Sequence, residues 1–218
     1  MNGFKSFMLP TLLVLHAATP LAGQATLAFK AGAGTSRIDF TGVELNEVEP
    51  RWGMTAGVSV TVPLAPRIGF ELWGAFTQRG ATATIFQLGE ISYRLNYVQL
   101  SALGKATVPV AADRVSVHLF VGPAAGLETS CTGRFTSALQ AIELTDECDS
   151  DQLNTPSTSV DLAVVGGAGT QFALAPRVGL SLDVLYTLGL RSTYAGELDR
   201  TARNRDMTVQ AGLVLPIG

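Results

Sequence analysis

The 218-residue sequence has little of what catalytic, metal-binding or nucleic-acid-binding proteins usually depend on. Two cysteines and two histidines are too few for a disulfide-dense scaffold or a zinc site. Only 15% of the residues are charged and the net charge is −3, so the composition gives no indication of a nucleic-acid partner. The short glycine motifs at 32–34 and 166–169 lie inside strand-like runs and open no helix, so they do not predict dinucleotide binding, and we expect no cofactor.

Long apolar runs are also missing, and the one near the N-terminus is too short to cross a bilayer. Lys5 precedes the apolar run 7–15, and small residues follow in ATPLAGQA, which together are typical of a secretory signal peptide. We therefore predict a cleavable signal peptide over residues 1–25 and a single mature domain over 26–218. The alternative is a buried N-terminal helix. An exported chain works outside the cytoplasm, where a disulfide persists.

What the sequence does have is strict alternation of apolar and polar residues. In VGLSLDVLYTLGL (178–190) every even position is apolar, while the odd positions include glycine, serine, aspartate and threonine. Period-two alternation is the pattern of a β-strand with two different faces. Eight such runs occur, at about 26–35, 52–62, 67–78, 93–108, 114–126, 158–172, 177–190 and 206–217.

The connections between these runs alternate in length. PLAP, PVAAD and ALAP are short, and they lead into the next run at Arg67, Arg114 and Arg177. The other connections, at about 36–51, 79–92, 127–157 and 191–205, are much longer. Short periplasmic turns and long extracellular loops are the asymmetry of outer-membrane barrels. The sequence thus predicts an all-β fold, an eight-stranded antiparallel up-and-down transmembrane β-barrel in the bacterial outer membrane, with Arg67, Arg114 and Arg177 at the periplasmic turns.

Charged residues in the runs lie on the parity opposite the bulky apolar residues. This separation suits a lipid-facing outer surface, because a Lys or Arg in lipid at the midplane costs about 2–4 kcal/mol. Eight strands leave an interior that side chains just fill, so we expect a plugged barrel with no diffusion pore. Its expected polar network consists of Lys30, Glu71, Gln99, Lys105, His118, Asp161 and Asp183. The run 93–108 loses its alternation near Tyr97, which suggests either a bulge or a solvent-exposed upper end of the strand there.

Two stretches resemble a known family. In YVQLSALGK (97–105), Tyr97, Gln99, Leu103 and Lys105 match a strand of the PorT-like outer-membrane β-barrel family, of the OmpX/OmpA eight-stranded type, with Ser101 where the family usually has Pro. VGPAAG (121–126) is similar to the Gly-Pro strand after the next turn. The resemblance implies an eight-stranded barrel without a defined activity, and a secretion-system role does not carry over from fold alone.

The end of the chain is similar to the signal read by the barrel-assembly machinery. In GLVLPI (212–217), Gly212 is followed by Leu215 and Ile217 at the signal's spacing, although the chain ends in Gly218 and not in an aromatic residue. This similarity implies the assembly machinery as a partner through the C-terminal strand. The expected lipid-facing surface makes outer-membrane lipids a second partner.

The longest predicted loop contains both cysteines, Cys131 and Cys148, and we expect a disulfide between them; two free thiols are the alternative. The acidic run 146–151 has oxygen ligands that calcium prefers, but its spacing misses the EF-hand pattern, so a solvated loop is favoured and no metal site is expected. Residues 134–144 are interpreted either as a short helix on the barrel or as a patch that binds a partner.

The expected function is structural or interactive, through the outer loops, with an extracellular or envelope protein as a candidate partner. An outer-membrane lipid-modifying enzyme is one alternative, but His118 is the only mature histidine and no G-x-S-x-G elbow exists, so we expect no catalytic residues. A soluble lipocalin-like binder of a hydrophobic ligand is another alternative; it would place the apolar face inside.

Overall fold

A computed structural model describes residues 24–41, 47–85, 89–111, 114–137, 143–148, 159–192 and 201–217. The first strand begins at Ala25. The predicted signal peptide, residues 1–25, lies almost wholly outside the described residues, so its cleavage stays a prediction.

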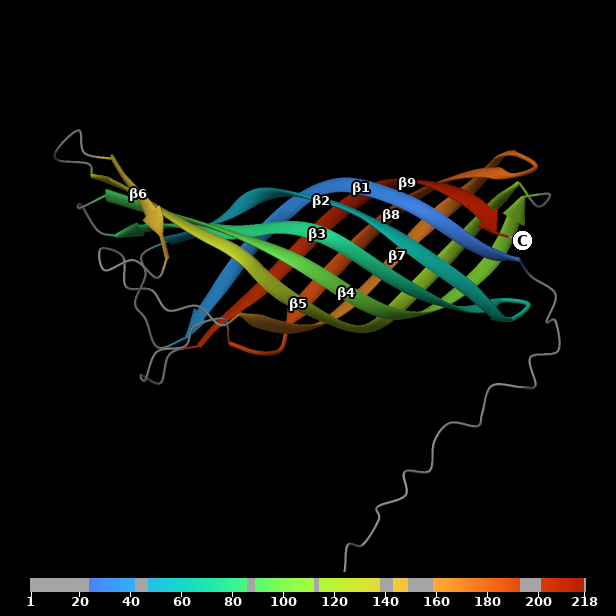
Figure 1. The fold of residues 1–218 in the computed structure, drawn as a ribbon, viewed down its shortest axis with the longest axis horizontal. Coiled ribbons are helices and arrows are strands. Elements are labelled where there is room, and N and C mark those ends of the chain that lie inside the picture. The colour runs from blue at the N-terminus through green and yellow to red at the C-terminus, as the bar shows by residue number, and fades with distance from the viewer. Residues whose placement is uncertain are drawn as a thin grey trace, which may run out of the picture.

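The described residues form nine strands, and eight of them close into a barrel (Figure 1). Neighbouring strands pair antiparallel throughout, and the ring closes where β1 pairs with β9 and β4 with β5. The ninth strand, β6, pairs only with β5. The predicted eight-stranded up-and-down barrel is confirmed. The strands are β1 (Ala25–Thr41), β2 (Glu47–Ala65), β3 (Ile68–Ile85), β4 (Gly89–Ala111), β5 (Val115–Ser137), β6 (Glu143–Glu147), β7 (Val160–Ala175), β8 (Val178–Gly189) and β9 (Thr201–Ile217).

One end of the barrel carries the short turns. Arg67, Arg114 and Arg177 are exposed there, at the turns that begin β3, β5 and β8. The backbone also links neighbouring turns, because the carbonyl of Arg67 accepts a 2.8 Å hydrogen bond from the amide of Thr107, and that of Arg114 accepts one of 2.8 Å from Ala173. Ala25 pairs with Ile217, so both ends of the barrel chain lie at this same end.

Most strands are longer than the sequence predicts, and the predicted long loops are correspondingly shorter. A tilted strand crosses a bilayer in about 9–11 residues, yet β4 and β5 each have 23. The predicted links at 36–51 and 79–92 are largely strand, because β1 runs to Thr41 and β3 to Ile85. Along these extensions apolar side chains such as Ala81 and Leu95 are buried inside and the polar side chains point outward, so the apolar–polar alternation reverses while the backbone ladder continues.

The segment predicted as a helix is also strand where it is described. Arg134–Ser137 ends β5, and Glu143 and Leu144 begin β6; residues 138–142 lie outside the described part of the chain. β6 pairs with β5 from Thr132 to Thr136, beyond Leu127, where the pairing of β7 with β5 ends. The helix interpretation is therefore wrong, and the hairpin continues the sheet past the end of β7.

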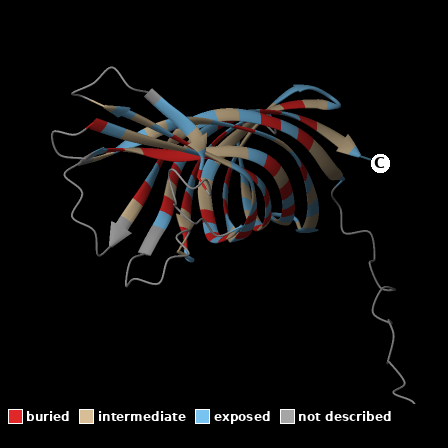
Figure 2. Cartoon of the chain, turned by 60° about the vertical axis from the view of Figure 1, so that its left-hand side comes forward, coloured by how far each residue is buried: buried red, intermediate tan, exposed pale blue. Residues whose placement is uncertain are grey.

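The two faces of the wall differ as the charge pattern requires. Apolar side chains such as Phe29, Val60 and Leu119 are exposed on the outside, while charged and polar side chains are buried inside. Figure 2 shows the resulting alternation of buried and exposed residues along each strand. The apolar face points outward, which excludes the lipocalin-like arrangement. In the part of the chain that the structure describes, no helix is long and apolar enough to cross a membrane.

The side chains of β4 keep the same alternation between the inner and outer faces of the wall through the position where the sequence suggests a bulge. Leu95, Tyr97, Gln99 and Leu103 are all buried. The register shift near Tyr97 comes from the facing strand, because Asn96 pairs with Ser130 while Tyr97 pairs with Glu128, which leaves Thr129 as the extra residue on β5. The alternation is lost in the sequence because large apolar side chains also occupy the interior of the barrel.

Candidate functional site

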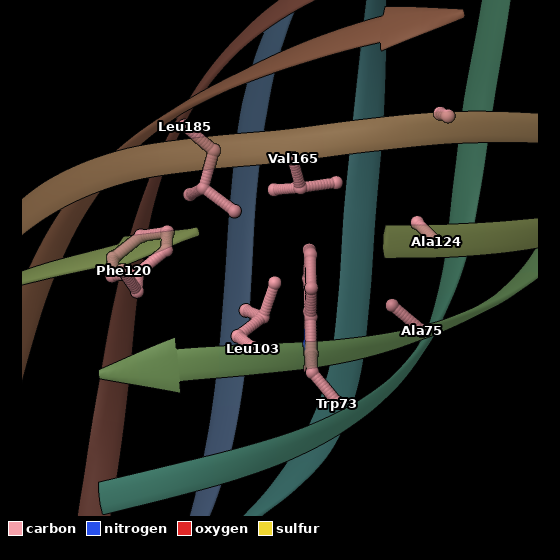
Figure 3. Close-up of a cluster of buried hydrophobic side chains, with 8 residues drawn as sticks. Trp73, Ala75, Leu103, Phe120, Ala124, Val165 and Leu185 are labelled. Carbon is pink, nitrogen blue, oxygen red and sulfur yellow. The ribbon is translucent and has the colours of Figure 1, made fainter. Parts of the chain in front are cut away.

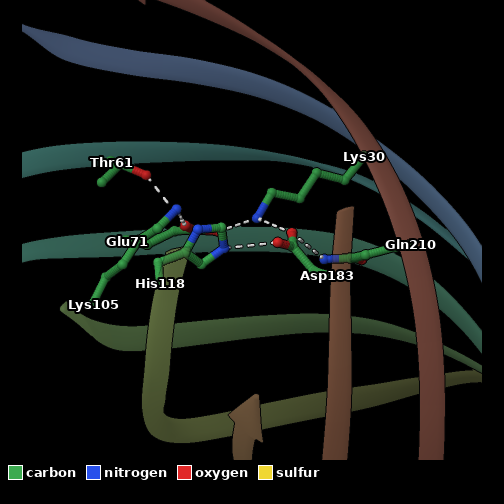
Figure 4. A network of polar contacts seen from close by, with 7 residues as sticks. All are labelled: Lys30, Thr61, Glu71, Lys105, His118, Asp183 and Gln210. Carbon is green, nitrogen blue, oxygen red and sulfur yellow. Dashed lines mark hydrogen bonds and ion pairs between the residues drawn. The ribbon is translucent and has the colours of Figure 1, made fainter. Parts of the chain in front are cut away.

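The interior nearest the turns is filled by an ion-pair network (Figure 4). Lys30 of β1 reaches across to β3 and β8, with its Nζ 2.6 Å from Oε1 of Glu71 and 3.2 Å from Oδ2 of Asp183. Nζ of Lys105 lies 3.0 Å from Oε2 of Glu71. Two lysines thus balance two carboxylates, and the hydroxyl of Thr61 donates a further hydrogen bond of 3.2 Å to Glu71. We call this group the inner network.

His118 completes the inner network from β5. Its Nε2 lies 2.8 Å from Oδ1 of Asp183, and its ring packs against Phe120 with 5.8 Å between the ring centroids. The pair lies directly against β7 at Gly169, where a β-carbon would collide with Oδ1 of Asp183 and lie 2.6 Å from Nε2 of His118. Gly169 therefore leaves the room in which the histidine and the carboxylate meet.

An apolar layer follows further along the barrel (Figure 3). Its largest members are Trp73 of β3, Leu103 of β4 and Phe120 of β5, and they converge with Leu185 and Val165 from the opposite wall. All are buried. The cluster packs side chains from five strands across the lumen, and so it separates the inner network from the polar groups beyond it.

The second polar group is organised by one arginine. Arg79 lies 2.6 Å from Oδ2 of Asp161 through Nη1, and 2.7 Å from Oδ2 of Asp206 through Nε. Its Nη2 donates a 2.5 Å hydrogen bond to Oε1 of Gln99, and its guanidinium carbon lies 5.1 Å from the centroid of the Tyr97 ring. We call this group the outer network. It holds one guanidinium against two carboxylates, and all three side chains are buried.

The structure places all seven residues of the expected polar network inside the barrel, but in two groups. Lys30, Glu71, Lys105, His118 and Asp183 belong to the inner network, whereas Gln99 and Asp161 belong to the outer network. Sequence reasoning missed Arg79, because it follows the last apolar residue of its run and was assigned to a loop. Its position in the alternation would have revealed it. The odd-numbered residues of β3, such as Glu71 and Trp73, point inward, and Arg79 continues this series.

The predicted disulfide between Cys131 and Cys148 is present, with 5.4 Å between the Cα atoms. Cys131 lies in β5 and pairs with Leu95, and Cys148 follows β6 directly. The bond fastens β6 to β5 and packs against the buried cluster that contains Leu95 and Tyr97. It therefore stabilises the hairpin that extends beyond β7.

The acidic run beside the disulfide shows no ligand cluster in the part that is described. No group of three or more His, Cys, Asp or Glu residues suited to a metal ion occurs among the described residues. Asp149 and Asp151 lie outside them. Asp146 instead accepts a 2.8 Å hydrogen bond from the backbone amide of Glu147.

The outer side of the wall changes character partway along the strands. Phe76, Val98 and Leu127 pair in one row across β3, β4 and β5, and all are exposed. Beyond this row the outward positions are polar, beginning with Gln78, Asn96 and Ser130. On β3 the apolar part runs from Ile68 to Phe76, which matches the length needed to cross a bilayer. The rest of β3 extends beyond it, together with β4, β5 and β6, and we call this part the projecting wall.

Comparison with solved structures finds similar outer-membrane barrels. OprG from Pseudomonas aeruginosa is 11% identical, with a TM-score of 0.51, 90% of this chain covered and 98% of that chain. Neisserial surface protein A is 12% identical, with a TM-score of 0.49 and coverages of 88% and 97%. The Escherichia coli outer membrane protein W is 15% identical, with a TM-score of 0.44 and coverages of 91% and 100%. Likeness at these identities concerns the fold alone.

Comparison with curated protein sequences finds no match. The model of one protein family, described as the outer membrane protein beta-barrel domain, matches residues 21–195. That match covers most of the sequence and all but the last strand of the barrel. It agrees with the closed ring of strands, the apolar outer face and the polar interior. The chain belongs to the outer membrane protein beta-barrel domain family and is a protein of the bacterial outer membrane.

Proposed function

We propose that this protein is a closed barrel that anchors a binding surface, the projecting wall, outside the cell. The observation that carries the proposal is the difference between the two ends. One end is limited to short turns, and the other extends β3, β4 and β5 far beyond the length that crosses a bilayer and adds β6. Short turns face the periplasm in outer-membrane barrels, so the projecting wall faces outward.

The filled interior supports the role of a membrane anchor and argues against a channel. The inner network, the apolar layer and the outer network follow one another along the lumen, and their charged side chains are paired. Opening a passage would separate ion pairs in a low-dielectric interior, where an unpaired charge is very unfavourable. Outer-membrane lipids then contact the apolar outer face. The assembly machinery is the proposed partner of β9, which ends at Ile217.

Conductance across a planar lipid bilayer tests the closed barrel. The refolded protein is first shown to be heat-modifiable, which means that its gel mobility differs between boiled and unboiled samples, as for a folded barrel. It is then added to the bilayer at rising voltage, with a general diffusion porin as the positive control. We expect no discrete current steps from this protein under conditions in which the porin gives them. Regular ohmic steps from the purified protein would contradict the proposal and favour a channel.

The geometry around His118 supports a non-enzymatic role. Catalysis by a lipid hydrolase needs a nucleophile beside a base that a third group orients. Asp183 contacts Nε2 of His118, but Nδ1 has no hydrogen-bond partner among the described residues and is buried. Ser116, two residues before His118 on β5, makes no hydrogen bond to it in the part of the chain that the structure describes. A phospholipase assay on the purified protein tests this, with product release above a His118→Ala control as the contradicting result.

We infer in addition that the chain belongs to the PorT-like group within its family. Support comes from Tyr97, Gln99, Leu103 and Lys105, which lie on the inward side of β4, where they pack in the lumen. Their spacing of two or four residues follows from that shared face. If the protein also works in an envelope complex, mild cross-linking of cells should recover a constant protein partner. A monomer alone would contradict that role.

A further inference from the structure

The projecting wall begins at the level of the lipid headgroups. Arg94 lies four residues beyond Val98, the last exposed apolar residue of β4 before the polar part. Four residues of strand span about 13 Å, which at a tilt of about 40° is about 10 Å of height. The headgroup layer is about 5–8 Å thick on each side of the hydrocarbon. The outward side chains around Arg94 therefore lie just beyond that layer, on its water side.

Three arginines from three strands meet on this outer face. Arg51 of β2, Arg94 of β4 and Arg134 of β5 line a pocket of about 310 Å³. Arg94 and Arg134 are exposed, and Arg51 is half-buried. Ser92 pairs with Arg134 across the strands, and Arg94 pairs with Thr132 one row nearer the membrane, so the two arginines lie on the same face of the sheet.

Arg51 reaches this face because of a local irregularity. The register of β2 against β3 shifts between Pro50 and Thr55, and such bulges redirect side chains. The side chain of Arg51 then runs over Gly80, whose missing β-carbon would lie 3.0 Å from Cδ of Arg51. Its Nη1 donates a 2.6 Å hydrogen bond to the hydroxyl of Ser92. Gly80 thus leaves the space over which the side chain of Arg51 reaches the pocket.

The positive charges of the pocket influence one another. Burial lowers the pKa of Arg51 below its ordinary value, and the neighbouring charges of Arg94 and Arg134 lower it further. Within the described residues no carboxylate lies at ion-pair distance from Arg51 or Arg94. Other arginines of the barrel differ: Arg205 lies 2.6 Å from Asp39, and Arg79 contacts Asp161 and Asp206.

The rest of the lining consists mainly of hydroxyl groups. Ser92, Thr132 and Thr145 border the pocket, and Thr145 comes from β6, which the disulfide fastens. Among the described residues of the lining Glu90 is the one carboxylate, and it lies at ion-pair distance from neither Arg51 nor Arg94. Planar guanidiniums that converge with hydroxyl donors match the oxygens of a phosphate group, which binds arginine in a bidentate manner.

We propose that the pocket formed by Arg51, Arg94 and Arg134 binds a phosphate monoester, carried either by a glycolipid headgroup of the outer leaflet or by a molecule free in solution. The proposal deepens the proposed function and rests on the outward direction of the projecting wall. The pocket lies beside the headgroup layer, so both a lipid headgroup and a soluble molecule can reach it. The phosphate would offset the mutual repulsion of the guanidiniums.

The test uses the full-length folded barrel in lipid nanodiscs and in detergent. Binding is measured for lipid A, for lipid A with its phosphates removed, and for glucosamine 6-phosphate in solution. Arg51→Ala and Arg94→Ala remove single charges, and Arg203→Ala, an exposed arginine of β9 outside the pocket, is the matched control. Heat modifiability verifies that each variant is folded.

We expect lipid A to bind and its dephosphorylated form to bind at least about tenfold more weakly, with a similar loss for each pocket variant and none for Arg203→Ala. Glu90→Gln removes the carboxylate of the described lining and should tighten binding. If glucosamine 6-phosphate binds as tightly as lipid A, the site holds and its ligand is a soluble phosphate. Equal binding of both lipid forms, or binding insensitive to the arginines, would overturn the proposal.

The two proposals fail in distinguishable ways. If purified protein binds phosphate through Arg51 and Arg94 but the projecting wall is not reachable from outside the cell, the site holds and the orientation is wrong. If the projecting wall is reachable and no phosphate binds, the orientation holds and the phosphate site is overturned.

Discussion

Leu182 and Asp183 are neighbours on β8 and lie on opposite sides of the barrel wall. Leu182 is 44% exposed on the outside, whereas Asp183 is 1% exposed and contacts Lys30 and His118. This pair shows which residues of β8 face outward and which face the lumen, because successive side chains of a strand alternate between its faces.

Replacing Leu182 with Arg should impair assembly into the membrane, since an arginine facing lipid costs about 2–4 kcal/mol near the midplane. Asp183→Asn keeps the shape of the inner network and should be tolerated far better. Heat-modifiable protein in the outer-membrane fraction measures both. Normal assembly of the arginine variant would contradict the assigned faces.

Gly169→Ala should destabilise the barrel by about 1–3 kcal/mol, because the new methyl group overlaps the contact between His118 and Asp183. Gly74→Ala is the matched control, since a β-carbon at Gly74 meets no atom within 4 Å. The free energy of unfolding in denaturant, measured with detergent present, compares the two. Equal values would show that the inner network does not need the space at Gly169.

Arg79→Leu should destabilise the protein by about 3–5 kcal/mol, because it leaves Asp161 and Asp206 buried without a positive charge. Asp206→Asn should cost much less, since one guanidinium then faces one carboxylate. The same unfolding measurement applies to both variants. A larger loss for Asp206→Asn than for Arg79→Leu would contradict the central place of Arg79 in the outer network.

Removing the disulfide with the double change Cys131→Ser and Cys148→Ser should affect the β5–β6 hairpin alone. The barrel is closed by other strands, so we expect it to remain heat-modifiable while protease cleaves near β6 faster. Limited proteolysis followed by mass spectrometry locates the cut. Loss of the heat shift itself would mean that the bond stabilises the whole barrel.

The membrane-spanning half of the molecule could be predicted from its sequence. There one face meets lipid and the other a polar lumen, so alternation is strict, and Lys30, Glu71 and Asp183 show their direction by parity. The short turns at Arg67, Arg114 and Arg177 follow from the same pattern, because each interrupts an alternating run.

The outer half could not be predicted in the same way. Beyond Val98 the apolar side chains of β4 point inward and the polar ones outward, which reverses the pattern of the membrane-spanning part, so the face of Arg94 could not be assigned from it. Arg134 falls in the segment 127–157, which the sequence predicts as a loop. Arg51 reaches the pocket only through a register shift and the space over Gly80, both of which depend on strand pairing. β6 has five residues, too few for its own alternation to be recognised.

Labelling of single cysteines on intact cells tests the central claim most directly. The two native cysteines are joined, so an impermeant maleimide reports only an introduced thiol. Thr84→Cys lies at the outer end of β3 and Arg67→Cys at a short turn, and both positions are exposed. We predict that the Thr84→Cys variant is labelled on intact cells and the Arg67→Cys variant only after permeabilisation. Labelling of Arg67→Cys alone on intact cells would contradict the outward direction of the projecting wall.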